Sequence, residues 1–270
     1  MQITRRPVAA ADPFGAARPD HVQLTGVPPG PRVTRTASRR RAPFVGTGLP
    51  RHAVAVVSGG LEDATLAYWL AAQGVALTLL SVDDGQPHRI ELHFARAAAL
   101  ALEADHHVAD LTAVNPLLVG QATTNAADPR PHQHACRATA VPNREAITLA
   151  IAVAVAIATG ADAVASGAHG GDDSPRAGCR PEFVDAFRRM TVAANDGVLP
   201  GGFAVLVPFA DMTRADIIAL GAELGVPFEK TWSCQRHGPR HCGTCPACTE
   251  RRALFALAEV ADPTEYAHPS

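Results

Sequence analysis

Residues 52–74 read HAVAVVSGGLEDATLAYWLAAQG, and this stretch decides the fold. It opens with a valine-rich apolar run, His52–Val57, whose length and composition predict a strand buried on both faces. A Ser-Gly-Gly turn at 58–60 ends the run, and from Leu61 apolar residues recur at helical spacing until Gly74. A strand, a glycine turn and a helix in this order present backbone N–H groups and the positive end of a helix dipole to a phosphate.

The Ser-Gly-Gly turn is weak evidence when taken alone, because the same turn joins ordinary strands to helices. In its context it resembles the pyrophosphate loop of ATP pyrophosphatases, which is usually written SGGxDS. Glu62 stands here where that pattern has Asp, and Asp63 stands where it has Ser. The resemblance implies that the phosphates of ATP are bound by Ser58, Gly59, Gly60, Leu61, Glu62 and Asp63.

The rest of the chain alternates apolar runs with helical patterns. We expect strands at 76–82, 106–111, 163–167 and 204–207, and helices at 88–103, 142–159, 181–193 and 213–224. This alternation predicts an α/β fold, a Rossmann-like parallel sheet with helices on both faces. In such sheets ligands bind at the carboxyl ends of the strands, where the turn at 58–60 and the loops 83–88 and 169–180 converge.

Composition predicts three parts: an Arg/Pro-rich N-terminal arm at 1–50, a nucleotide-binding α/β domain at 51–228 and a zinc-binding segment at 229–270. Residues 1–51 hold nine Arg and two Asp, which leaves the remainder of the chain near −9. A body this acidic argues against nonspecific binding of bulk nucleic acid. The longest uncharged apolar stretch, 146–158, is too short to span a membrane, so we expect a cytoplasmic protein.

A cysteine motif lies near the C-terminal end, where residues 234–248 read CQRHGPRHCGTCPAC. The spacing predicts one tetrahedral Zn²⁺ site built from Cys234, Cys242, Cys245 and Cys248. Disulfides are the alternative, but the expected compartment disfavours them, and an iron–sulfur cluster is the other chemistry that thiolates at this spacing allow. Four thiolates close the coordination shell, so zinc here would hold the fold and would not activate water.

From about His52 onward the chain resembles the QueC family, the 7-cyano-7-deazaguanine synthases, whose fold is of the adenine nucleotide alpha hydrolase type. The segments that carry the resemblance are VVSGG, SVDDGQPH, VPNRE, ADAVASGAHGGDDS, CRPEF and CGTCPACTERRALF. The resemblance implies an ATP-dependent ligase that converts 7-carboxy-7-deazaguanine and ammonia, through an acyl adenylate and an amide, to the nitrile, with Mg²⁺ sharing the phosphate charge. It also implies that Arg144 and Arg180 lie by the acyl adenylate and that Asp172 faces the substrate.

Several positions depart from the family pattern. QRH becomes QPH at 86–88, VPxRN ends in Glu145, and YPDC has Gly178 in place of its Asp. That Asp would pair with the guanine-like edge of the substrate, and losing a buried hydrogen-bonding partner changes selectivity. Two alternatives therefore stay open: a divergent ligase that joins a deazapurine acid or another carboxylate to a different amine, in specialised metabolism or phage defence, and a catalytically impaired nucleotide-binding scaffold. The expected partners are small molecules, with a homodimer as one option.

Three charged residues have alternative interpretations. Glu62 and Asp63 in a first helical turn suit the helix dipole. In an ATP site, however, they repel the polyphosphate unless Mg²⁺ bridges them, so we expect weak ATP binding and slow ATP consumption. For Arg180 the structural alternative is a surface ion pair with Glu182 or Asp185.

Overall fold

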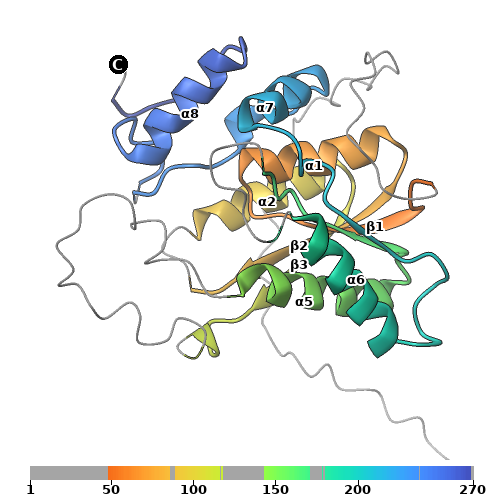
Figure 1. Cartoon of the computed structure of the whole chain (residues 1–270). Coiled ribbons are helices and arrows are strands. Elements are labelled where there is room, and N and C mark those ends of the chain that lie inside the picture. Colours follow the sequence, from red (N-terminus) through yellow and green to blue (C-terminus); the bar gives the residue numbers. More distant parts are fainter. Residues whose placement is uncertain are drawn as a thin grey trace, which may run out of the picture. The chain divides into compact units, whose positions relative to one another are not determined.

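The structure is a computed structural model that describes residues 48–85, 89–115, 117, 143–170, 178, 180–236 and 238–268. Within these residues five strands form one parallel sheet in the order β3-β2-β1-β4-β5 (Figure 1). Their bounds are β1 His52–Val56, β2 Ala76–Asp83, β3 Asp105–Asp110, β4 Ala163–Ala165 and β5 Ala204–Leu206. The strand order reverses between β1 and β4, which lie side by side at the centre of the sheet.

Helices cover both faces of the sheet, as the alternating pattern predicts. On one face lie α1 (Leu61–Ala72), α2 (Ile90–Ala101) and α7 (Arg214–Glu223), and on the other lie α5 (Arg144–Thr159) and α6 (Pro181–Ala194) (Figure 1). A 3₁₀ turn, η3 (Phe228–Lys230), leads into the cysteine segment, and α8 (Pro246–Leu257) follows it. None of the described helices is long and apolar enough to cross a membrane.

The central strand shows why the apolar run at 52–57 forms the core. Ala53 and Ala55 pack with Leu66 of α1, whereas Val54 between them packs with Leu149 of α5. Successive side chains of a strand point to opposite faces, so both faces of β1 are covered only because both alternate sets are apolar. This two-sided burial confirms the α/β fold.

Two element boundaries differ from the sequence predictions. The helix expected from residue 142 begins at Arg144, because Asn143 before it adopts a left-handed conformation (φ 61°) that an α-helix does not contain. The strand expected over 163–167 ends at Ala165, because the chain turns there into the loop that carries Ser166 and Gly167.

The sequence analysis missed α8. The buried face of this helix consists of Cys248, Arg251 and Phe255, so a cysteine and an arginine stand where an apolar repeat would have signalled a helix. Phe255 shares a core cluster with Leu61 of α1 and Ile218 of α7, which packs α8 directly on the sheet-covering helices.

Candidate functional site

The Ser-Gly-Gly turn follows β1 at the carboxyl end of the sheet, where the strand order reverses. Ligands of open α/β sheets bind at such a switch point. Gly59 has φ +97°, and a Cβ on it would lie 2.1 Å from the backbone oxygen of Glu91 in α2, so only glycine fits. Gly60 is the N-cap of α1. We call this turn (residues 58–60) the phosphate loop. It packs closely against α2, and it leads into the N-terminus of α1, where the helix dipole is positive.

Asp63 binds back onto the phosphate loop. Its Oδ2 accepts hydrogen bonds from the Ser58 backbone N–H at 2.8 Å and from the Ser58 hydroxyl at 2.6 Å. Burial raises the pKa of Asp63 to about 6, although the two hydrogen bonds from Ser58 act in the opposite direction. Its Oδ1 lies 2.6 Å from the point where a Cβ on Gly167 would stand, so the loop after β4 packs closely on this carboxyl group. Asp63 therefore occupies donors that the loop offers to an anion.

Glu62, by contrast, is neutralised by a cation. Its Oε1 lies 2.7 Å from Nε of Arg214, the first residue of α7, and 4.0 Å from Nε2 of His169. Burial raises the pKa of Glu62, but the Arg214 guanidinium and further hydrogen bonds outweigh burial, so the net pKa is lowered. The sequence analysis expected the carboxylates of Glu62 and Asp63 to repel the polyphosphate of ATP. For Glu62 this expectation is corrected, because Arg214 neutralises its charge.

A second charged group lies across the carboxyl end of the sheet. Arg144 at the start of α5 contacts Asp84 after β2, with 3.2 Å between Nη2 and Oδ2. Glu145, the next residue, accepts a hydrogen bond from the Ser166 hydroxyl after β4 at 2.8 Å. Residues that follow β1, β2 and β4 therefore meet at one edge of the sheet, while most of the predicted loop 169–180 lies outside the described residues.

Arg180 is the N-cap residue of α6, and its side chain is exposed. The structural alternative for Arg180 was an ion pair with Glu182 or Asp185. Asp185 pairs instead with Arg188 at 3.3 Å and with Arg189 at 2.7 Å. Asp172 and residues 86–88 lie outside the described residues.

Gly178 places the loop before α6 against the start of α5. A Cβ on Gly178 would lie 2.3 Å from Cγ of Glu145, so the glycine backbone packs directly on that side chain. The two positions at which this chain departs from VPxRN and YPDC are therefore in contact, and the start of α6 lies next to the start of α5.

Three site residues escaped the sequence analysis: Glu91, His169 and Arg214. Burial raises the pKa of Glu91 to about 7, Arg144 opposes the rise, and Asp63 and Asp84 add to it. Arg214 meets Glu62 across 152 positions of the chain. No local pattern in the sequence can indicate a pair of residues this far apart, so the sequence analysis had no signal for it.

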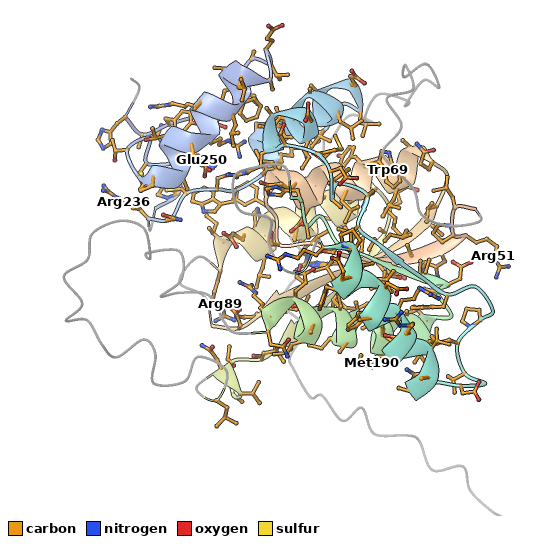
Figure 2. The ribbon with its side chains drawn as sticks, viewed as in Figure 1. Arg51, Trp69, Arg89, Met190, Arg236 and Glu250 are labelled. Atoms are coloured by element: carbon orange, nitrogen blue, oxygen red, sulfur yellow. The ribbon has the colours of Figure 1, made fainter. Side chains whose placement is uncertain are left out.

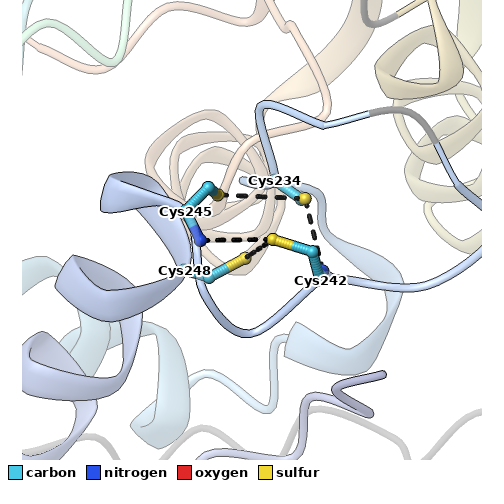
Figure 3. Close-up of side chains that lie close together, drawn as sticks. All are labelled: Cys234, Cys242, Cys245 and Cys248. Atoms are coloured by element: carbon cyan, nitrogen blue, oxygen red, sulfur yellow. Dashed lines mark hydrogen bonds between the residues drawn. The ribbon is translucent and has the colours of Figure 1, made fainter. Parts of the chain in front are cut away.

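The four predicted cysteines form one compact cluster (Figure 3). The Sγ atoms of Cys242 and Cys248 are 3.9 Å apart, those of Cys234 and Cys245 are also 3.9 Å apart, and all four lie within 4.8 Å of one another. Four sulfurs placed 2.3 Å from a tetrahedral ion would be separated by about 3.8 Å, so the geometry fits a single metal ion. Burial raises the pKa of the Cys242 thiol, but hydrogen bonds, chiefly from Thr244 and Cys245, outweigh it and lower the pKa to about 6.

The cysteine cluster lies against the phosphate loop through Trp232. The Trp232 backbone N–H donates to the Gly59 oxygen at 2.9 Å, and its indole Nε1–H donates to the Cys234 oxygen at 2.8 Å. The indole is 2% exposed and stacks on Phe94 of α2 with ring centroids 5.5 Å apart. The segment that carries the cysteines therefore packs against one side of the phosphate loop.

An apolar groove lies away from these groups. It has a volume of about 560 Å³ and lies between α5 and α6, and its lining includes Ile147, Phe183 and Met190. Figure 2 labels Met190, which lies on α6. The lining of the groove offers few hydrogen-bond donors, and phosphates require them, so the phosphate loop remains the better candidate for a nucleotide site.

Comparison with known proteins agrees with this geometry. A family model described as "Queuosine biosynthesis protein QueC" matches residues 52–259. The 7-cyano-7-deazaguanine synthase of Rhizobium meliloti (strain 1021) is 47% identical over 219 residues, which cover 80% of this chain and 92% of the relative. The synthase of Paracoccus denitrificans (strain Pd 1222) is 45% identical over 216 residues, which cover 79% of this chain and 92% of that relative. With its parallel sheet, its phosphate loop at the switch point and its four-cysteine cluster, the chain belongs to the QueC family.

Proposed function

We propose that this chain is an ATP-dependent carbon–nitrogen ligase that converts 7-carboxy-7-deazaguanine and ammonia to 7-cyano-7-deazaguanine. The observation that carries the proposal is the phosphate loop at the β1–β4 switch point, with the Arg144–Asp84 pair across the same edge of the sheet. Relatives that bear the name of this synthase, at 45–47% identity, support the choice of product.

The chemistry requires two activations. The first is needed because a carboxylate is a poor electrophile, and the second because the amide oxygen is a poor leaving group. A carboxylate oxygen of the substrate attacks the α-phosphorus of ATP and releases pyrophosphate, which gives an acyl adenylate. Ammonia adds to the carbonyl carbon and loses a proton. The C–O bond to the adenylate then breaks, and AMP leaves with its electron pair, which gives the amide. The amide oxygen then attacks a second ATP, pyrophosphate leaves again, and loss of AMP with the nitrogen-bound protons gives the nitrile.

The side chains of the site suit these steps. The phosphate loop would bind the pyrophosphate end of ATP through its amides and the α1 dipole, and bound Mg²⁺ would share the phosphate charge. Arg144 and Arg180 would supply forked donors to the acyl adenylate. Asp172 would face the substrate. We assign the contacts with the ATP phosphates to the phosphate loop and the first turn of α1: Ser58, Gly59, Gly60, Leu61, Glu62 and Asp63.

We assign a structural Zn²⁺ to Cys234, Cys242, Cys245 and Cys248. The observed sulfur spacing and the set of four thiolate donors suit zinc, and four protein ligands leave no open position for water. The ion would therefore stabilise the segment that packs against the phosphate loop and would take no part in the reaction.

The deciding experiment is mass spectrometry of the products formed from ATP, Mg²⁺, 7-carboxy-7-deazaguanine and ¹⁵N-ammonium. A ¹⁵N-labelled nitrile supports the proposal. An adduct with a different added amine would identify a divergent ligase, and the absence of AMP release would identify a nucleotide-binding scaffold.

Arg180→Ala provides the variant arm of this experiment. Turnover should be lost because Arg180 is proposed to contact the acyl adenylate. The melting temperature should change little, because the Arg180 side chain is exposed at the N-cap of α6. Arg189→Ala, on the same helix and in an outer ion pair with Asp185, is the matched control and should retain both. Unchanged turnover of Arg180→Ala would remove this arginine from the site.

The departures at 62 and 63 lead to a further expectation. Because Asp63 holds both donors of Ser58, ATP must compete with an internal carboxylate, and we expect slower ATP consumption than in a Glu62→Asp/Asp63→Ser double variant. The measurement is release of AMP and pyrophosphate at saturating Mg²⁺, with ATP affinity by calorimetry. Equal rates and affinities would show that the carboxylates are compatible with bound MgATP.

A further inference from the structure

Arg214 contacts two carboxylates that belong to different parts of the site. Its Nε lies 2.7 Å from Oε1 of Glu62, and its Nη1 lies 2.8 Å from Oε1 of Glu250. Glu62 stands in the first turn of α1, directly after the phosphate loop. Glu250 stands on α8, whose N-cap is the cluster residue Cys245 (Figure 2). The arginine therefore connects the phosphate loop with the helix that carries part of the cysteine cluster.

The Glu62 carboxylate lies beside Gly60, the last residue of the phosphate loop. Its second oxygen, Oε2, is 3.5 Å from the point where a Cβ on Gly60 would stand, and Gly60 is the N-cap of α1. The side chains of Glu62 and Arg214 are only 19% and 20% exposed, so solvent screens their charges incompletely. Without Arg214, a negative charge would remain beside the donors to which an anionic ligand must bind.

The start of α7 holds Arg214 in a fixed place. Thr213 caps the helix, since its hydroxyl accepts from the Asp216 N–H at 3.1 Å while the Asp216 carboxylate accepts from the Thr213 N–H at 3.1 Å. Ile217 and Ile218 in the same turn are fully buried. Because its backbone is anchored in this way, Arg214 can direct its guanidinium at both carboxylates with little loss of conformational freedom.

We propose that Arg214 is a positioning residue for ATP, which neutralises Glu62 beside the phosphate loop and is itself oriented by Glu250 of α8. The proposal rests on the proposed function, because it takes the phosphates of ATP as the ligand of the loop. A purely structural role would be to fasten α7 between α1 and α8. The two roles differ in what happens when the charge of Glu62 is removed together with Arg214.

The test is calorimetric titration of the full-length, metal-loaded protein with MgATP. Arg214→Ala should raise the Kd by about tenfold or more, and Glu62→Gln added to that variant should return it to within about threefold of the parent. Arg189→Ala removes an arginine from an outer ion pair and should leave the Kd unchanged. Arg214→Lys keeps the positive charge beside Glu62, so it should bind ATP within about threefold of the parent even where the alanine variant folds poorly.

Kinetics and metal content separate the two roles further. Arg214→Ala should raise the KM for ATP by a factor similar to the Kd, with kcat changed by less than about threefold. Glu250→Gln should weaken ATP binding by about threefold while zinc content stays that of the parent, because Glu250 orients Arg214 and binds no metal. These variants retain all four cysteines, so loss of metal is not the cause of the expected changes.

Three outcomes would overturn the inference. Equal ATP affinity of the parent and Arg214→Ala, or weakened binding that Glu62→Gln fails to restore, would assign Arg214 to the fold alone and leave the proposed function standing. A parent protein that binds no MgATP would overturn the proposed function, and the inference with it.

Discussion

The cysteine cluster and the phosphate loop are neighbours in the structure but are assembled in opposite ways. All four sulfur ligands of the cluster fall within residues 234–248, and backbone amides from the same segment point at the sulfurs. The site around the phosphate loop draws its residues from several elements: Glu62 on α1 meets Arg214 on α7, and Glu145 on α5 meets Ser166 after β4. One centre is complete within a short segment, whereas the other exists only when the whole sheet is formed.

This difference has consequences for stability and function. The cysteines of the cluster are close in sequence, so little loop entropy is lost in bringing them together. A metal ion bound to them would supply folding free energy directly. A site assembled from distant elements depends on each of them being in place, and its charges are balanced only after folding. Trp232 and Arg214 connect the two regions. Trp232 donates hydrogen bonds to the backbone oxygens of Gly59 and Cys234. Arg214 pairs with Glu62 in the first turn of α1 and with Glu250 on α8.

The largest expected effect comes from breaking the local centre. Cys245→Ala removes one of four thiolates, and structural zinc contributes about 10–16 kcal/mol to the folding of small domains, so we expect loss of metal and a fall of several kcal/mol in the free energy of unfolding. Elemental analysis and denaturant unfolding measure both. Thr249→Ala on the same helix is the control and should retain the metal. Full zinc content and an unchanged unfolding midpoint in Cys245→Ala would contradict the assignment.

Next in size is the buried arginine that ties the cysteine segment together. Arg251 is 1% exposed and donates to the Phe228 oxygen and to the hydroxyls of Thr231, Ser233 and Thr264. Arg251→Met removes all four of these buried hydrogen bonds, although the Phe228 oxygen still accepts from the Thr231 hydroxyl and N–H. We expect a loss of about 3 kcal/mol or more in urea unfolding. Arg252→Met, on the following, partly exposed residue, should cost about 1 kcal/mol. Equal losses in the two variants would mean that the burial of Arg251 does not determine its contribution to the free energy of unfolding.

A packing contact between distant elements should give an intermediate effect. A Cβ on Gly178 would lie 2.3 Å from Cγ of Glu145, so Gly178→Ala should lower stability by about 1–3 kcal/mol through overpacking. Glu145→Ala removes the Cγ and Cδ atoms, and in that background the added cost of Gly178→Ala should fall below about 1 kcal/mol. Thermal unfolding of the four proteins gives the coupling. An additive result would exclude this contact as the cause.

The smallest expected effect is the pH dependence that Asp63 introduces. Burial raises its folded-state pKa to about 6, whereas a free aspartate has a pKa of about 3.9. The folded state therefore holds this proton more tightly, so stability from Asp63 is fully present below the unfolded pKa and is lost as the pH rises through 6. The full shift corresponds to about 3 kcal/mol, of which about 2 kcal/mol is lost between pH 4 and 7. Asp63→Asn does not titrate, and its stability should fall less than that of the parent between pH 4 and 7. Parallel pH profiles would contradict the shifted pKa.

Much of the fold could be read from local patterns. The five strands, the helices on both faces, the turn at 58–60 and the four sulfur ligands follow from apolar periodicity, glycine placement and cysteine spacing, all of which extend over a few residues. The prediction failed where the local signal was misleading. The start of α5 is delayed by the left-handed Asn143, and α8 buries Arg251 on the face that an apolar repeat would have marked.

The sequence by itself determined the α/β architecture, the phosphate-loop turn and the identity of the cysteine ligands, because each depends on neighbours along the chain. Only the tertiary structure decided which carboxylates are balanced. Glu62 and Asp63 are adjacent acids in one helical turn, yet Glu62 meets a guanidinium 152 positions away, while Asp63 turns back to Ser58 and acquires a raised pKa. Charge pairing and desolvation depend on distances in space, and those distances are set only when α7 packs against α1.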